Sequence, residues 1–164
     1  MGGCQSSDQG MGAYRSKFRR DALKSHNKYR AEHGAPPLKI DSKINKYAQK
    51  WAENCAKKAQ LAHRSEHQYG ENIHYAFDSR GIENITGEMA SKAFYDEINH
   101  YNFSSPGFTS GTGHFTQLVW KSSLRVGIGV AVNPQNKNQV FSVFNYEPAG
   151  NVQGQFPENV LQKK

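Results

Sequence analysis

Apolar residues recur at helical spacing in the first part of the chain. From Ile44 to Ala56 they fall three and four residues apart, which predicts a helix with one buried face. Asp41 precedes this run and can cap it, because its carboxylate can accept a hydrogen bond from a free amide of the first turn. Residues 15–33 also suit a helix. We expect it to end within residues 34–37, where a glycine and two prolines follow, because proline lacks an amide donor and restricts its predecessor.

A third amphipathic pattern begins at Thr86 and carries one carboxylate onto an apolar face. Continuing the spacing of its apolar residues puts Glu97 and then Tyr101 on the inward side. An acidic side chain in that position needs an explanation, so Glu97 is a candidate functional residue.

The remaining patterns predict strands and one short helical turn. Residues 70–77 lie between turn formers and fit a strand, and residues 126–132 and 139–146 alternate around a polar loop, as in a hairpin. A loop rich in glycine and serine delivers His114 to the start of an apolar helical turn that ends at Trp120. We therefore expect α+β structure without an internal repeat.

Chain length and cysteine content limit the number of domains and the cellular compartment that we expect. A chain of 164 residues can bury one core and is short for two. Its two cysteines are Cys4, in the N-terminal segment, and Cys55, on the inner face of a predicted helix, so we expect no structural disulfide and a reducing compartment. No stretch reaches the roughly 18 apolar residues of a spanning helix, and residues 1–12 lack the apolar core of a secretory signal.

Positive charge favours anionic partners. Lys and Arg number 21 against 14 Asp and Glu, a net charge of +7, which suits phospholipid head groups or nucleic acid. Nucleic-acid binding would rest on charge alone, since no motif with aromatic residues among basic ones is present, and we expect no such partner. Much of the excess lies near the N-terminus, where we predict a membrane-binding basic cluster made of Arg15, Lys17, Arg19, Arg20 and Lys24.

The N-terminus carries an acylation pattern. MGGCQS fits M-G-x-x-x-[ST], with Gly2 as the myristate acceptor, and the nearby Cys4 can carry palmitate. One acyl chain binds membranes only marginally, so stable residence needs a second chain or a basic cluster, and this segment offers both. The alternative is an unmodified tail. Its small polar residues predict flexibility over residues 1–13, ahead of one folded domain over residues 14–164.

Two longer motifs carry a family resemblance. GHFTQLVW, from Gly113 to Trp120, and NYEPAGN, from Asn145 to Asn151, resemble segments of the CAP (pathogenesis-related-1-like) superfamily, with support from SHNKYRAEHGAPPL and GENI. Motifs of this length in the expected order are far more specific than a short glycine pattern. The resemblance implies a single-domain α-β-α sandwich with a central cleft.

The same resemblance implies two histidines and two acidic residues in that cleft, matching His63, Glu71, Glu97 and His114. Two imidazoles with carboxylates can bind Zn²⁺, here through His63 and His114, or can act as general acids and bases. The alternative is a buried polar network without turnover. The sequence has no G-x-S-x-G elbow, and Cys55 lies in a helix core, so we expect a protein that is not an enzyme.

Secreted relatives typically carry several disulfides and a signal peptide, which sets this sequence closer to the Golgi-associated plant pathogenesis-related branch. That branch implies myristoylation, the cytoplasmic face of Golgi or other membranes, and a homodimer. One hypothesis is therefore a membrane-associated protein that binds anionic lipids, sterol or protein partners. The other is a Zn-dependent hydrolase in which Glu71 or Glu97 acts as base toward a metal-bound water.

Overall fold

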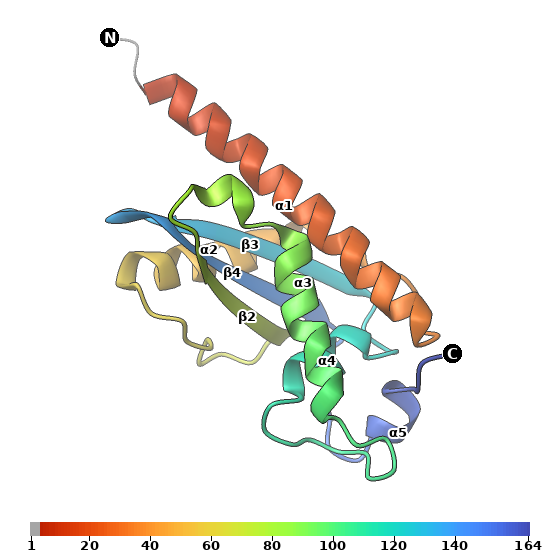
Figure 1. The fold of residues 1–164 in the computed structure, drawn as a ribbon. Coiled ribbons are helices and arrows are strands. Elements are labelled where there is room, and N and C mark those ends of the chain that lie inside the picture. Colours follow the sequence, from red (N-terminus) through yellow and green to blue (C-terminus); the bar gives the residue numbers. More distant parts are fainter. Residues whose placement is uncertain (1–3) are drawn as a thin grey trace.

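The computed structural model describes residues 4–164, with side chains from Asp8 onward. Gly2 lies outside the described residues, as does the side chain of Cys4, so both acylation sites stay predictions. Figure 1 shows the elements, which are α1 (Cys4–Glu32), β1 (Lys39–Ile40), α2 (Ser42–Lys58), β2 (Gly70–Phe77), η1 (Ile82–Asn84), α3 (Gly87–Tyr95), η2 (Asp96–His100), α4 (Gly113–Val119), β3 (Arg125–Asn133), β4 (Asn136–Glu147) and α5 (Phe156–Asn159).

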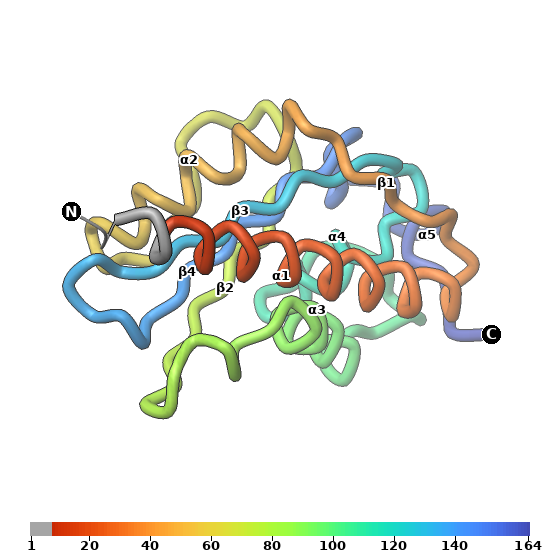
Figure 2. Tube along the Cα trace, turned by 90° about the horizontal axis from the view of Figure 1, so that it is seen from above, coloured from red at the N-terminus to blue at the C-terminus, as the bar shows by residue number. Residues whose placement is uncertain are grey.

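The strands form one mixed sheet in the order β1-β3-β4-β2, in which β1 runs parallel to β3 and the other neighbours are antiparallel. Helix α2 covers one face of the sheet, while α1, α3 and α4 lie toward the other (Figure 2). Alternate residues of β4 serve the two layers: Phe141 and Val143 pack beneath α2, and Phe144 and Tyr146 pack toward α1 and α3. The expected single-domain α-β-α sandwich is confirmed.

The predicted helix starts are confirmed by their caps. The Asp41 carboxylate accepts a hydrogen bond from the amide of Ile44 at 3.0 Å at the start of α2. The Thr86 hydroxyl accepts one from the amide of Met89 at 3.2 Å at the start of α3. Each bond satisfies an amide that the first helical turn leaves free, which is why these local signals could be read from the sequence. Strand β2 also has the predicted bounds.

The hairpin is tighter than predicted. Strand β4 begins at Asn136, so Pro134 and Gln135 alone separate it from β3, whereas the sequence pattern suggested a loop of several residues. Strand pairing uses backbone groups, so polar residues can continue the ladder. The side chain of Asn133 also accepts the amide of Gln135 at 2.9 Å and donates to Gln139 at 2.7 Å, which holds the turn closed.

Helix α1 begins earlier than predicted. We expected it to start near Arg15, and it starts at Cys4, because no proline interrupts residues 4–14 and a helix that is already packed extends without a new nucleation step. Gly10 and Gly12 disfavour this extension by about 1 kcal/mol each but do not prevent it. A Cβ atom at either glycine would meet nothing within 4 Å, and the first turns of α1 project beyond the rest of the fold (Figure 1). The predicted flexibility of residues 1–13 stays a prediction.

Helix α2 packs unusually close to β3 because the strand presents glycine toward it. A Cβ atom on Gly127 would lie 2.1 Å from the backbone carbon of Ile44, and one on Gly129 would lie 2.4 Å from that of Ala48. The intervening residue, Ile128, points to the other face and is fully buried there. The VGIGVAV segment therefore places glycines against α2, where there is no room for a side chain, and apolar side chains against α1 and α3 on the other face of the sheet.

The exposed edge of β3 is covered by side chains. Strand β1 pairs only with Arg125 and Val126, yet the next peptide groups along β3 also have partners. Asn45 accepts the amide of Ile128 at 2.8 Å, and Gln49 both accepts the amide of Val130 and donates to its carbonyl, at 3.0 and 2.9 Å. Arg19 donates to the carbonyl of Ile128 at 2.7 Å. Helices α1 and α2 thus complete an edge that β1 leaves open.

The close contact between α2 and β3 predicts a strongly position-dependent effect of adding one methyl group. Gly127→Ala should lower the free energy of unfolding by about 1–3 kcal/mol, since the new Cβ would overlap backbone that cannot rotate away. Gly12→Ala is the matched control and should be neutral or stabilising, because that position is open and helical. Urea denaturation of both variants measures the difference, and equal stability would contradict the packing described.

Candidate functional site

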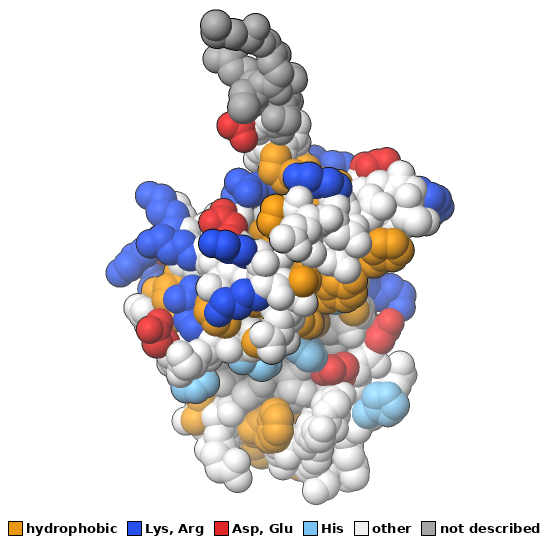
Figure 3. All heavy atoms as spheres, turned by 90° about the vertical axis from the view of Figure 1, so that its left-hand side faces the viewer, with side chains coloured by type: hydrophobic (Ala, Val, Ile, Leu, Met, Phe, Trp, Pro, Cys, Tyr) orange, Lys and Arg blue, Asp and Glu red, His pale blue; other side chains and the backbone are white. Residues whose placement is uncertain are grey.

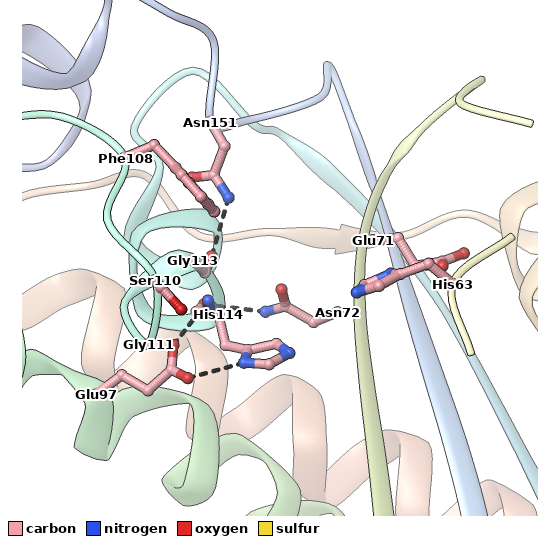
Figure 4. Close-up of a pocket in the computed structure, with 10 residues that line it drawn as sticks. All are labelled: His63, Glu71, Asn72, Glu97, Phe108, Ser110, Gly111, Gly113, His114 and Asn151. Carbon is pink, nitrogen blue, oxygen red and sulfur yellow. Dashed lines mark hydrogen bonds and ion pairs between the residues drawn. The ribbon is translucent and has the colours of Figure 1, made fainter. Parts of the chain in front are cut away.

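One cavity of about 310 Å³ opens where β2 begins, between the loop after α2 and the start of α4 (Figure 4). The four residues expected in a cleft all line it, although they come from four separate segments. They are His63 in the loop after α2, Glu71 in β2, Glu97 in η2 and His114 in the first turn of α4.

Glu97 and His114 form one half of the site. One Glu97 oxygen accepts the amides of His114 and Phe115 at 2.8 and 3.2 Å, and the other contacts Nδ1 of His114 at 2.9 Å. The carboxylate thus satisfies amides that the first turn of α4 leaves free. An ionised carboxylate only accepts, so Nδ1 of His114 carries the proton and its Nε2 is left free of this contact. This double role explains a carboxylate on the inward face of a helix.

Glu71 and His63 form the other half, in which the carboxylate again contacts Nδ1 of the imidazole. Oε1 of Glu71 lies 3.0 Å from Nδ1 of His63 and 3.0 Å from the amide of Arg64, and Oε2 accepts from Asn145 at 3.2 Å. The hydrogen bond that the imidazole donates to Glu71 raises the pKa of His63 against the opposing effect of its burial. Burial would raise the pKa of Glu71, but its bonds to His63, Arg64 and Asn145 together hold it below the usual value. The pair is therefore an ion pair at mildly acidic pH.

Beneath the cavity lies a buried polar network that sequence reasoning missed. Asn72 donates to the carbonyl of His114 at 3.0 Å and to the hydroxyl of Tyr146 at 3.3 Å (Figure 4 shows the first bond). That hydroxyl lies 2.7 Å from Nε2 of His26, which is fully buried on α1. Burial lowers the pKa of His26 to about 3, so it stays neutral and can accept this bond. The network ties α1, β2 and β4 to the peptide that carries His114.

A second amide holds the rim of the cavity. Asn151 donates to the carbonyl of Gly113 at 2.9 Å and accepts the hydroxyl of Thr116 at 2.6 Å, so it fixes both ends of the first turn of α4 (Figure 4). Like Asn72 and Asn145, it belongs to the segments GENI and NYEPAGN, which carried the family resemblance. The signal was present in those motifs, but spacing alone gives an asparagine no role.

The other histidines differ from one another. His26 and His33 are buried and hydrogen-bonded, and His67 is exposed in a polar hollow that it shares with His63. His74 on β2 packs edge-on against Phe94, whose ring stacks on His114 with centroids 5.1 Å apart. Burial, and then the nearby His114, lower the pKa of His74 to about 4, so this imidazole is neutral at physiological pH and lies close to the cleft.

The arrangement lacks an activated nucleophile. Among the described residues, no hydroxyl or thiol hydrogen-bonds to the imidazole of His63 or His114. Ser110 lines the cavity without such a bond. Cys55 is buried in the α2 layer, as predicted, where burial raises the pKa of its thiol. Acyl transfer through a serine or cysteine therefore has no support in this geometry.

Zinc fits the donor set in part. Each cleft histidine is oriented by a carboxylate through Nδ1 and keeps Nε2 for a ligand, as in carboxylate–histidine–zinc sites. Among the side chains of residues 8–164, however, no three of His, Cys, Asp or Glu are grouped closely enough to hold one ion. A metal here would have two protein ligands, and water or a bound molecule would complete its coordination.

The predicted basic cluster divides between two faces of α1. Lys17, Arg20 and Lys24 are exposed, whereas Arg19 bonds to β3 and to Gln49, and Arg15 lies 3.8 Å from Glu53 on α2. No helix of the described chain is long and apolar enough to cross a bilayer. Of the five residues predicted for membrane binding, three therefore have side chains exposed enough to contact a membrane surface.

The two halves of the site predict how His63 titrates. Glu71→Gln should lower the pKa of His63, since it removes the carboxylate that stabilises the charged imidazole. Glu97→Gln is the matched control: it removes the partner of His114 and should leave the titration of His63 in place. NMR titration of the histidine ring protons distinguishes the two, and an unchanged His63 in Glu71→Gln would contradict the pairing.

Comparison with known proteins places this cleft in a family. Residues 23–146 match the CAP model, described as the cysteine-rich secretory protein family. The chain is 44% identical over 160 residues to Golgi-associated plant pathogenesis-related protein 1 of Homo sapiens, covering 94% of this chain and 99% of that one. It is 37% identical to pathogenesis-related protein 1A of Nicotiana tabacum, covering 84% of this chain and 79% of the relative.

Solved structures agree on the fold. BmVAL-1 superposes with a TM-score of 0.69 at 21% identity, covering 90% of this chain and 84% of that one. The crystal structure of NaASP2 with Zn²⁺ gives the same TM-score at 26% identity, covering 90% and 86%. With its two motifs, its sandwich and its histidine–carboxylate cleft, the chain belongs to the CAP family and is related to the human Golgi-associated member.

Proposed function

We propose that this chain is a non-enzymatic, membrane-associated protein of the cytoplasmic face of Golgi-type membranes. In this proposal acyl groups on Gly2 and Cys4 anchor it, basic side chains hold it on anionic lipid, and its surfaces bind lipid, sterol, protein partners or a second copy. The observation that carries the proposal is the path of α1, whose first turns leave the domain with open space around Gly10 and Gly12. An N-terminal anchor is thereby separated from the folded body.

The cleft suits binding better than turnover. Both carboxylates are already engaged by backbone amides as well as by histidines, so each holds loop positions while it orients an imidazole. A general base is most useful when its proton-accepting oxygen faces the substrate. The free Nε2 atoms, in contrast, can accept from a ligand or bind a metal. We therefore assign the cleft to recognition of a polar or metal-bound partner.

Acyl anchoring predicts that adding one methyl group at Gly2, but not at the adjacent Gly3, changes where the protein is located in the cell. Gly2→Ala should shift the protein from membranes to cytosol in a eukaryotic cell, because it removes the myristate acceptor. Gly3→Ala is the matched control, since it keeps the M-G-x-x-x-S pattern. Fractionation with intact-mass measurement, before and after hydroxylamine, reports both location and acyl groups. Unchanged membrane partition of Gly2→Ala at physiological salt would refute acyl anchoring.

A second candidate, metal-dependent hydrolysis, is favoured by one observation, namely that the two cleft histidines share the same carboxylate-oriented geometry. The relative NaASP2 was crystallised with Zn²⁺. In this function His63 and His114 would hold the metal, which would supply an activated water. Glu71 or Glu97 would accept its proton. Whichever of the two accepts the proton, its carboxylate would have to give up a hydrogen bond to a backbone amide.

Metal binding has its own test. Zn²⁺ titration by calorimetry should show a site that His63→Ala or His114→Ala weakens at least about tenfold. His67→Ala is the matched control, because His67 is close in sequence but does not line the cavity. If Zn²⁺ binds and peptides or esters are cleaved only when His114 is intact, the hydrolase is correct. Binding without cleavage would leave metal recognition as the role of the cleft.

A further inference from the structure

The outward face of α2 is formed by lysines. Lys43, Lys46, Lys50 and Lys57 are all exposed, and at 100° per residue they fall within about 60° around the helix axis. The buried residues of α2 lie on the opposite side of the axis. At about 1.5 Å per residue these four lysines span about 21 Å. We call them the α2 lysine face.

These ammonium groups have no acidic partner in the described part of the chain. The lysines that form ion pairs there are Lys17, Lys92 and Lys163. The acidic residues nearest the face in sequence are engaged elsewhere, since Asp41 contacts Arg125 and Glu53 contacts Arg15. Figure 3 shows basic side chains gathered on the side of the molecule that carries α2.

The exposed part of α1 is less available to an anion. Lys17 forms an ion pair with Asp21, and Arg20 lies 3.8 Å from the other oxygen of the same carboxylate. The Asp21 carboxylate competes with any external phosphate for Lys17 and Arg20, and it reduces the net positive field along this part of α1. Of the exposed residues in the predicted cluster, Lys24 alone has no ion pair among the described residues, so this cluster carries less uncompensated charge than the α2 lysine face.

From these observations we infer that the α2 lysine face is the surface with which this protein contacts an anionic phospholipid bilayer. This inference deepens the proposed membrane role, which it presupposes. Lysines on flexible stems, each contributing roughly fivefold to binding, suit the laterally mobile charges of a bilayer. None of the residues that line the histidine cleft lies on α2, so contact through this face leaves the cleft open to the cytosol.

A bilayer fits this face better than nucleic acid does. Proteins that bind single strands add aromatic side chains on which bases stack. Among the described residues, the exposed large aromatic side chains are on β2 and in the loop before α4, namely Tyr75, Phe77 and Phe108. On α2, Tyr47 and Trp51 pack against Arg64. The lysine face thus offers charge without stacking.

The test compares two triple charge reversals in the unmodified full-length chain, so that its outcome does not depend on acylation. Lys43→Glu/Lys46→Glu/Lys50→Glu alters the α2 lysine face, and Lys17→Glu/Arg20→Glu/Lys24→Glu alters α1 by the same charge. Co-sedimentation uses phosphatidylcholine vesicles with and without about one third phosphatidylserine. The α2 variant should lose at least about tenfold in partition to the anionic vesicles, and the α1 variant no more than about threefold. Circular dichroism confirms that both variants fold.

Three outcomes would overturn the inference. A larger loss in the α1 variant would assign the contact to α1. Equal losses would mean that net charge, and no particular face, governs binding. Tighter binding of a random RNA than of vesicles through the same α2 lysines would make the face a nucleic-acid surface. Failure of Gly2→Ala to leave membranes would instead refute acyl anchoring, and would not change any of these vesicle results.

Discussion

The cleft depends on one buried charge, the guanidinium of Arg30. It is fully buried on α1 and donates to the carbonyls of Pro36, Leu118, Trp120 and Ser123 at 2.7–2.9 Å. Burial lowers its pKa to about 10, so it remains charged at neutral pH. Two of these carbonyls belong to the end of α4 and the residue after it. A positive charge at that end stabilises the helix, just as the Glu97 carboxylate does at the start.

This clamp explains how a helix of seven residues can hold His114 in place. Isolated helices so short are unstable in water, because nucleation costs more than their few hydrogen bonds return. Helix α4 is therefore defined by its surroundings: charges at both ends, Asn72 and Asn151 at its first turn, and Phe115 and Leu118 in the core. The position of the His114 imidazole therefore depends on contacts from all layers of the sandwich, so the site forms only when the whole domain is folded.

Features set by neighbouring residues were predictable, and those set by tertiary contacts were not. The caps at Asp41 and Thr86 and the bounds of β2 follow from local chemistry. The grouping of His63 with Glu71, and of His114 with Glu97, was expected only from the family motifs, since the residues in each pair come from separate segments. Charge counting could not reveal that Arg19 and Arg30 point inward, because both sit in a basic stretch like their exposed neighbours. Nor does a motif assign roles to Asn72 or Asn145.

The covered edge of β3 affects how copies of this chain can meet. A sheet edge with free peptide groups is a template for a strand from another molecule. At β3 the peptide groups of Ile128 and Val130 are taken by Asn45, Gln49 and Arg19, so recruitment of a foreign strand there would first have to break bonds inside the fold. Strand β2 is the last strand on the other side of the sheet, and its Tyr75 and Phe77 are exposed. The two sides of the sheet therefore differ: on one, side chains of α1 and α2 occupy peptide groups of β3 beyond the short strand β1, and on the other β2 forms the edge.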